Sequence, residues 1–357
     1  MHPAPTPAPV MFNLTVDDFD SLVTFPDQSQ WTTPNPSAAH DPALDFWFDG
    51  TYHNTNVSGA SFSFDFEGSF TALLPADLDL RSTSGAPGPA FGSYKVAIDG
   101  CAEEFSAHAA QNASGHLLYS TKSLAYKEHT VKVTNLGAKR RGEAHNMLVD
   151  FLKTTVELAP AGATLTNTTL EETDPRLVYT GNWTVCYLPS GSRRENVYNP
   201  LFSGGYSRYT NGDGASVSLS FHGTALFIFG DKPDRHGLYT VALDARPPAT
   251  LNGVSGCGGA FAHACEKDNT LVFFAANFDG SEHTVTVTNV PGMLGAYSDL
   301  DAVVYTTPSR YLLVRRGAVQ LGARRASGVL PRAAMPGVHA LLLLFFVGML
   351  LARPFRR

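Results

Sequence analysis

The sequence predicts an all-β protein of two tandem antiparallel β-sandwich domains, followed by a C-terminal hydrophobic helix. Three observations predict this fold class. One ten-residue stretch occurs twice, as GASFSFDFEG at residues 59–68 and as GASVSLSFHG at residues 214–223. In both stretches apolar and polar residues alternate, which is the period of a half-buried strand. Neither half of the chain has a sustained 3.6-residue apolar period that would indicate a helix.

The residues that follow each stretch also match, in the same order and at similar spacing. YKVAIDG at residues 94–100 corresponds to YTVALDA at residues 239–245, and EHTVKVTN at residues 128–135 corresponds to EHTVTVTN at residues 282–289. A match of this length indicates a whole domain used twice. The predicted organisation is a disordered N-terminus (1–11), a first repeat (12–158), a linker (159–167), a second repeat (168–308), a basic stalk (309–337) and a hydrophobic segment (338–352).

The alternation of apolar and polar residues along each predicted strand identifies which side chains should be buried. Phe62, Phe64 and Phe66 alternate with polar residues, and Val217, Leu219 and Phe221 do the same in the second repeat. Further runs rich in β-branched and aromatic residues are bounded by Gly, Pro, Asn or Asp, as strands usually are. Many short strands with one apolar face need a second sheet to cover that face. We therefore expect Phe64 and Leu219 to occupy equivalent buried positions.

A family resemblance rests on VDD (16–18), Trp31, GTYH (50–53), the stretch at 59–68, YKVAIDG and HTVKVTN. In this order these motifs resemble the galactose-binding-domain-like jelly roll, in the duplicated form found in membrane-anchored surface proteins of mushroom-forming fungi. The resemblance covers nearly all of residues 12–308. It departs where residues 72–89 replace the shorter connection at 227–235. It implies a jelly-roll fold and a cell-surface setting rather than a particular reaction.

Composition is that of a globular chain, with 43% hydrophobic and 16% charged residues. The net charge is −6, and residues 310–357 contain arginines but no acidic residue. The body is therefore strongly acidic and the basic charge is confined to the tail. An acidic body argues against a nucleic-acid partner.

The tail contains an apolar run at residues 338–352, interrupted only by His339. As a helix it would be roughly 22 Å long, short of the roughly 30 Å hydrocarbon core. One interpretation is a short transmembrane helix with Arg353, Arg356 and Arg357 as a cytoplasmic stop. The other is a glycolipid (GPI) anchor signal, with small residues at 326–328, a spacer at 329–339 and a removable tail at 340–352. Either would make the membrane a partner.

The N-terminus, the N-glycosylation sequons and the cysteines bear on which side of the membrane the two domains lie. The N-terminus has no basic or apolar signal region, which favours a tail-anchored protein with cytosolic domains. Five sequons favour an extracellular glycoprotein instead: Asn13, Asn56, Asn112, Asn167 and Asn182. Cys257 and Cys265 flank a short loop and are predicted to form a disulfide, whereas Cys101 and Cys186 are as readily explained as free, buried thiols. We expect the domains to be extracellular, with the tail-anchored arrangement as the alternative.

The chain contains no HExxH, CxxC, GxSxG or Gly-Lys-Ser/Thr phosphate loop. The sequence therefore predicts no catalytic residues and a chain that is not an enzyme. His129 and His283, and Asp99 and Asp244, recur at equivalent positions and are predicted to stabilise turns. Trp31 and Trp183 also recur, and burial is the predicted reason.

Ligand-binding candidates lie in aromatic, polar segments before each twin stretch, because sugars stack on aromatic rings and bond planar polar groups. These candidates are Trp47, Tyr52, His53, Tyr206, Arg208 and Tyr209. Acidic residues at the start of each repeat could meet acidic residues on its last strand and hold Ca²⁺ there, or they could be solvated surface charge. These are Asp18, Asp20, Asp150, Glu172, Asp174 and Asp301. No other cofactor is predicted.

The predicted function is a non-enzymatic cell-surface protein whose two carbohydrate-binding-like modules bind glycans or cell-wall polysaccharide, with two copies raising avidity. Two alternatives remain: an inert structural ectodomain, and a glycan-active enzyme.

Overall fold

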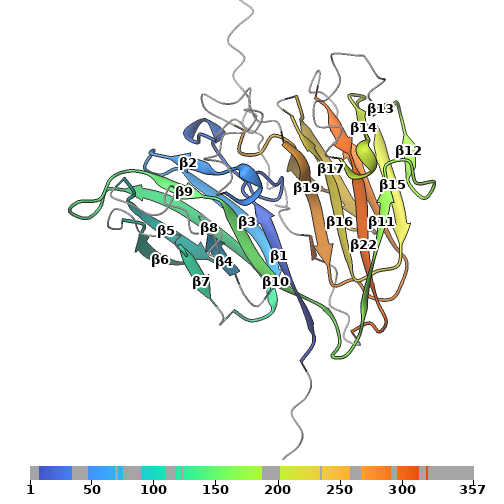
Figure 1. The fold of residues 1–357 in the computed structure, drawn as a ribbon, viewed down its shortest axis with the longest axis horizontal. Helices are drawn as coiled ribbons and strands as arrows, with labels where there is room; N and C mark the ends of the chain where they lie inside the picture. The colour runs from blue at the N-terminus through green and yellow to red at the C-terminus, as the bar shows by residue number, and fades with distance from the viewer. Residues whose placement is uncertain are drawn as a thin grey trace, which may run out of the picture. The chain divides into compact units, whose positions relative to one another are not determined.

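The computed structural model describes residues 8–33, 47–68, 71–74, 90–108, 117–121, 124–186, 202–233, 235–257, 267–290, 296–312 and 319–320. These residues form β-strands, turns and a few 3-10 helices, which confirms the all-β prediction (Figure 1). Residues 1–324 form one compact unit. The predicted hydrophobic segment, 338–352, lies outside the described residues. Within the described part of the chain, no helix has the length and apolar character needed to cross a membrane.

Strands of the first repeat form three sheets, with the orders β1-β10-β4-β7, β3-β8-β5-β6 and β2-β9. Their pairings are antiparallel, as predicted. The first strand begins two residues before the predicted start of the repeat. The bounds are β1 Val10–Asp17, β2 His53–Thr55, β3 Ser61–Gly68, β4 Thr71–Leu74, β5 Ser93–Ile98, β6 Cys101–Ser106, β7 Tyr119–Thr121, β8 Lys127–Gly137, β9 Met147–Val149 and β10 Phe151–Ala159.

Strands of the second repeat form sheets of the same pattern, β11-β22-β16-β19-β23, β12-β15-β20-β17-β18 and β13-β14-β21, and the last strand of the first of these sheets, β23, comes from the predicted basic stalk. The bounds are β11 Leu165–Glu171, β12 Val178–Thr180, β13 Thr184–Cys186, β14 Ser207–Thr210, β15 Ser216–Phe221, β16 Ala225–Lys232, β17 Leu238–Leu243, β18 Ala249–Asn252, β19 Lys267–Ala276, β20 His283–Asn289, β21 Ser298–Leu300, β22 Ala302–Pro308 and β23 Val319–Gln320. The 3-10 helices η2 (Phe48–Gly50) and η4 (Ser203–Gly205) precede β2 and β14 at corresponding places.

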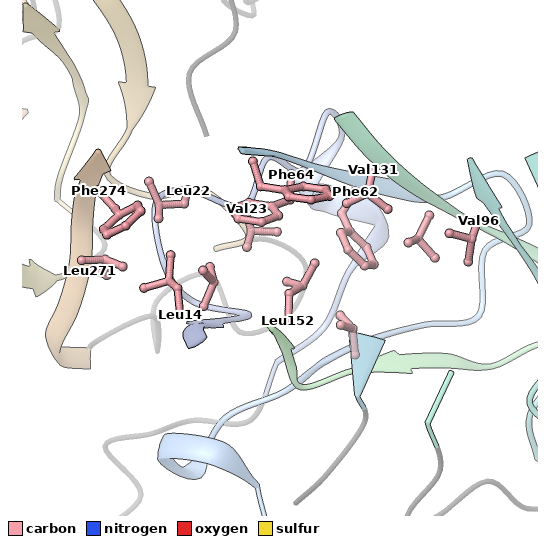
Figure 2. Close-up of a cluster of buried hydrophobic side chains, with 14 of the residues drawn as sticks. Leu14, Leu22, Val23, Phe62, Phe64, Val96, Val131, Leu152, Leu271 and Phe274 are labelled. Carbon is pink, nitrogen blue, oxygen red and sulfur yellow. The ribbon is translucent and has the colours of Figure 1, made fainter. Parts of the chain in front are cut away.

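The core of the first repeat forms where its two four-stranded sheets meet. Phe62 and Phe64 of β3 pack with Leu14 of β1 and Leu152 of β10 in one buried cluster, which is the arrangement of a β-sandwich (Figure 2). Phe64 and Leu219 are both buried, as the alternation predicts. The polar positions of β3 differ from the prediction because Ser63 and Glu67 are buried as well. Glu67 accepts a hydrogen bond from Asn277 of the second repeat, which accounts for its burial.

Two central strands of the sheet β11-β22-β16-β19-β23, β16 and β19, are buried on both faces. Ala225 and Phe227 of β16 belong to the same cluster as Phe62, whereas Leu226 and Ile228 belong to the core of the second repeat. In Figure 2, Leu271 and Phe274 of β19 lie beside Leu22 of the first repeat. The two repeats therefore share a continuous apolar core.

The repeated His and Asp residues stabilise equivalent turns. Asp99 and Asp244 both have φ of 51°, in the left-handed region. Each accepts a hydrogen bond from a histidine near the start of the adjacent strand, at 2.8 Å from His129 Nδ1 in β8 and 3.0 Å from His283 Nδ1 in β20. Each also accepts the backbone N–H of the next residue in that strand, Thr130 or Thr284. This confirms the structural role predicted for these four residues.

Tryptophans and cysteines differ between the repeats. Trp31 is fully buried, whereas Trp183 is only half-buried and donates its indole N–H to the Thr180 carbonyl at 3.2 Å. Cys257 is disulfide-bonded, and its predicted partner, Cys265, lies outside the described residues. Cys101 is a free thiol but is exposed, contrary to the prediction of burial, because it opens the edge strand β6.

Candidate functional site

Each repeat places acidic residues side by side where its first strand ends. Asp17 pairs with Phe151, the residue after Asp150. In the same register, Glu171 pairs with Ala302, the residue after Asp301. The turn that follows is also the same, because Asp20 N–H donates to the Asp17 carbonyl at 3.0 Å and Asp174 N–H donates to the Glu171 carbonyl at 2.9 Å. Two structurally equivalent acidic clusters can therefore be compared directly.

The first acidic cluster consists of Asp17, Asp18, Asp20 and Asp150, all of which are buried. Two lysines of the second repeat supply its positive charge. Lys267 forms a buried ion pair with Asp17, and Lys232 donates to the Phe19 carbonyl within the same loop. Because a buried charge needs a partner, these contacts make the two repeats interdependent.

The second repeat also closes over the first cluster. His53 is fully buried, with Nδ1 against Asp18 and Nε2 2.7 Å from the Gly256 carbonyl. Leu271 N–H donates to Asp20 Oδ1 at 2.7 Å, and Ser255 donates to the Val23 carbonyl. The predicted ligand-binding residue His53 thus faces the interior rather than solvent.

Burial shifts the pKa values in this cluster strongly. It raises the pKa of Asp17 and of Asp20 to about 7, even with Lys267 nearby. It raises the pKa of Asp150 to about 10, with the neighbouring Asp18 adding to the shift. Burial also lowers the pKa of His53 to about 3, so the imidazole is neutral at pH 7.

One group in this cluster has metal-ligand spacing. Carboxylate oxygens of Asp17, Asp18 and Asp150 lie within 4.8 Å of one another, so two of the predicted calcium ligands do come together. The Lys267 ammonium already pairs with Asp17, however. A calcium ion bound by these three carboxylates would have to compete with this ammonium for Asp17.

The second acidic cluster consists of Glu171, Glu172 and Asp301. Ser203 in η4 holds two of these carboxylates together: its backbone N–H donates to Asp301 Oδ2 at 3.2 Å, and its hydroxyl donates to Glu171 Oε1 at 2.9 Å. The other two oxygens, Glu171 Oε2 and Asp301 Oδ1, are buried and have no hydrogen-bond partner. Unpaired buried acceptors of this kind are costly and are therefore uncommon in native proteins.

Burial and like charge determine how this cluster titrates. Burial raises the pKa of Asp301 to about 7, and the carboxylates of Glu171, Glu172 and Asp231 add to the shift. Burial likewise raises the pKa of Glu172. A carboxylic acid with such a pKa still carries its proton in a substantial fraction of molecules at neutral pH.

Arg208 occupies the position that His53 has in the first repeat, since it pairs with Leu300 just as His53 pairs with Val149. Its guanidinium lies over the Tyr179 ring at 4.5 Å, and its Nε donor is buried without an acceptor. The neighbouring Tyr206 is 47% exposed. The second cluster thus offers unpaired acceptors and lies beside an unpaired donor, and an exposed aromatic residue stands two positions before that donor in the chain.

The other residues predicted to bind a ligand, a metal or a glycan either pack against neighbouring side chains or lie apart from this cluster. Trp47 is buried against Tyr52, with ring centroids 4.8 Å apart, and Tyr209 packs against Tyr297. Asp174 pairs with Arg176 at 2.8 Å, which lowers its pKa to about 2. Of the sequon residues, Asn112 lies outside the described residues and the others are exposed: Asn13, Asn56, Asn167 and Asn182.

Sequence reasoning missed Ser203, Lys232 and Lys267. Lys232 ends β16 and Lys267 begins β19, but polar residues separate each lysine from the apolar part of its strand, so the sequence contained no signal that either is buried. Ser203 had no signal either, because its role depends on Glu171 and Asp301, which are 32 and 98 positions away.

Comparison with known proteins connects the chain to carbohydrate chemistry. No family model matches it. A curated relative from Flavonifractor plautii, named A type blood alpha-D-galactosamine galactosaminidase, is 25% identical over 260 residues, which is 72% of this chain and 20% of the relative. The chain thus spans about a fifth of that relative's length. The prediction that the chain is not an enzyme is wrong on this finding, because a protein similar over most of the chain is named as an enzyme.

Solved structures give only distant similarity. A Paenibacillus xanthan lyase is 14% identical, with 85% of this chain and 27% of the lyase covered and a TM-score of 0.27. A family two carbohydrate esterase from Cellvibrio japonicus is also 14% identical, with 42% of this chain and 37% of the esterase covered and a TM-score of 0.28. At these scores the likeness carries no argument about this chain.

Proposed function

We propose that this protein is a glycan-active enzyme and that the second acidic cluster is where it acts on a glycosidic bond. The observation that carries the proposal is the pair Asp301 and Glu171, which Ser203 holds together, each with one carboxylate oxygen that has no partner. Glycoside hydrolysis generally uses two carboxyl groups, one of which donates a proton. The galactosaminidase relative supports this reaction class.

Asp301 is suited to the role of general acid. Its pKa of about 7, raised chiefly by burial, leaves the carboxyl group partly protonated at neutral pH, so it can donate to a leaving oxygen. Glu171 is only half-buried and is suited to the second role, either as a base toward water or as a stabiliser of positive charge on the sugar ring.

The surrounding residues supply recognition. Arg208 offers an unpaired N–H donor for a sugar hydroxyl, and Tyr206 offers an exposed ring on which a sugar face can stack. The galactose-binding-like jelly roll is the finer fold that we propose for both repeats. In the first repeat the equivalent cluster is closed by Lys267 and Lys232, so we propose one active cluster rather than two.

The test is hydrolysis by the purified full chain, measured on a panel of aryl hexosides and aryl hexosaminides of both anomers. Asp301→Asn and Glu171→Gln should each lower kcat by about 10² to 10⁴. Activity of the wild type should fall as pH rises past about 7, because the proton donor is then lost. Glu103→Gln, an exposed glutamate on β6, is the matched control and should leave kcat unchanged.

Absence of turnover on the whole panel, or retention of activity in both cluster variants, would overturn the proposal.

We further propose that the body is extracellular, since the described sequon asparagines are exposed. A mass decrease on enzymatic deglycosylation of material from the native host would support this placement, and an unchanged mass would count against it.

A further inference from the structure

We infer that Trp183, Tyr179 and Arg208 form a second sugar subsite beside the acidic cluster, so that the substrate is an oligosaccharide rather than a single sugar. This inference rests on the proposed function, because it extends the same site to the neighbouring sugar unit. The evidence is a stack of three side chains that both repeats contain and that a loop covers in the first repeat.

In the first repeat, the ring of Phe25 lies between two other rings. Its centroid is 5.1 Å from that of Trp31 and 4.4 Å from that of His53. A loop of the second repeat covers this stack. His53 Nε2 lies 2.7 Å from the Gly256 carbonyl oxygen, and a Cβ added to Gly256 would lie 2.9 Å from Phe25 Cε2. All three rings of the stack are therefore buried.

The second repeat contains a stack with the same order and spacing. The Tyr179 centroid is 5.1 Å from that of Trp183, and the Arg208 guanidinium lies over the Tyr179 ring at 4.5 Å. Strand register makes the two stacks equivalent. The residue after Trp183 pairs with the residue after Arg208. The residue after Trp31 likewise pairs with the residue after His53.

The two stacks differ in burial and in hydrogen bonding. Phe25 and Tyr179 lie at equivalent places, because each comes two residues after the N–H donor that closes the same turn, at 3.0 Å in both repeats. Phe25 is buried, whereas Tyr179 is only partly buried. Arg208 Nε is buried and has no acceptor, whereas the equivalent His53 has the Gly256 carbonyl beside it. The second stack therefore lacks the acceptor that the first stack has.

The second stack adjoins the proposed catalytic pair. The Tyr179 hydroxyl donates to the carbonyl of the residue after Glu171, at 2.7 Å. Arg208 pairs with the residue before Asp301. A sugar unit held at the two carboxyl groups would therefore have its neighbouring unit at the stack.

The chemistry of the stack suits a neutral sugar. A sugar ring has an apolar face that can pack on an aromatic ring, and its oxygens can accept the free N–H of Arg208. Trp183 and Tyr179 also pack against the core of the second repeat, which fixes the position of their rings. Burial raises the pKa of Glu172 and the charge of Arg208 opposes that rise, so the guanidinium already lies near a carboxylate. An anionic ligand would therefore gain little from Arg208.

Trp183 provides a direct measurement of binding. The chain has three tryptophans, and the other two, Trp31 and Trp47, are buried. Quenching of the fluorescence by acrylamide should therefore report on Trp183. The experiment uses the full chain with Asp301→Asn, so that hydrolysis does not consume the ligand. The ligands are cello-, chito-, manno- and galacto-oligosaccharides of one to six units.

Disaccharides or trisaccharides of at least one series should protect Trp183 from acrylamide and bind about three- to tenfold more tightly than the matching monosaccharide. In isothermal titration, Trp183→Ala should reduce this gain to less than about twofold, and Trp183→Tyr should keep most of it. Arg208→Lys should also reduce the gain, because lysine keeps the charge but has no Nε–H. Trp31→Phe, at the equivalent buried position of the first repeat, is the matched control and should leave the gain unchanged.

Equal affinity for monosaccharides and oligosaccharides, or an unchanged gain in Trp183→Ala, would overturn the inference. The proposed hydrolysis would still stand if Asp301→Asn abolished turnover of aryl glycosides. Conversely, Trp183-dependent binding of oligosaccharides without turnover of any glycoside would sustain the subsite and overturn the proposed reaction. Protection of Trp183 by the peptide NGVSG, the sequence of the covering loop at 252–256, but by no saccharide would assign the stack to a protein loop and overturn the inference.

Discussion

Lys267 can be tested as the link between the two repeats by replacement with methionine, which keeps the length and apolar stem of the side chain but removes its charge. Its ammonium pairs with Asp17, and the side chains of the two residues are 7% and 2% exposed. In Lys267→Met the Asp17 carboxyl group would remain buried without its cation. Removing one partner of such a pair generally costs about 3 to 5 kcal/mol.

Protonation limits this cost and makes it depend on pH. Burial already raises the pKa of Asp17 to about 7 with the lysine present, and loss of the lysine should raise that pKa further. The folded variant therefore holds a proton that the unfolded chain releases above pH ~4. The stability deficit of Lys267→Met should grow with pH, by up to about 1.4 kcal/mol per unit above pH 7.

Urea unfolding followed by tryptophan fluorescence suits the measurement, because Trp31 is fully buried in the first repeat. Lys139→Met is the matched control, since Lys139 pairs with Glu104 at 2.6 Å but both side chains are about half exposed. The control should lose no more than about 0.5 kcal/mol. If Lys267→Met loses as little as the control, or if its deficit stays constant between pH 5 and pH 8, the argument for a buried ionic link fails.

Three further outcomes are expected in the same unfolding assay. Because burial raises the folded-state pKa of Asp301 to about 7, this carboxyl group alone should cost the wild type about 2 to 4 kcal/mol of stability as pH rises from 4 to 7, in addition to the losses from the other buried acids. Asp301→Asn should make the total loss smaller by that amount, and parallel pH profiles of the two proteins would contradict the shift. Asp99→Ala should lower the free energy of unfolding by about 2 kcal/mol, because it removes the turn hydrogen bonds and leaves an alanine at φ 51°. Asp99→Asn should lower it by less than half as much. Equal losses in the two variants would argue against the turn role. Phe274→Ala should lower the free energy of unfolding by about 3 to 5 kcal/mol, because Phe274 packs in the core shared by both repeats. The control Val178→Ala, at an exposed position, should lower it by at most about 0.5 kcal/mol. A small loss in Phe274→Ala would mean that the shared core contributes little to stability.

The second acidic cluster was only partly predictable from the sequence. Glu172 and Asp301 were identified from their recurrence in the chain, but their sequence spacing suggested calcium. The structure instead places Ser203 between Glu171 and Asp301 and leaves two oxygens unpaired. The chemistry of the cluster depends on those unpaired atoms, and hydrogen-bond partners cannot be read from a linear pattern.

By itself the sequence determined the strands, the repeat and the turns at Asp99 and Asp244. Alternation and turn chemistry act between residues that are near in the chain, so they can be recognised without coordinates. The continuous apolar run at 225–229 also contained a signal that was not used, because a strand buried on both faces has no alternation.

Only the tertiary structure decided that the two acidic clusters differ. Asp17 and Glu171 look alike in sequence, yet Asp17 pairs with a lysine 250 positions away and Glu171 pairs with a serine in its own repeat. Burial and partner charges set the pKa and the binding capacity of a carboxylate, and both are properties of neighbours in space. A duplicated sequence therefore yields one sealed cluster and one unfilled cluster, because one repeat covers the other and nothing within the described chain supplies a lysine in return.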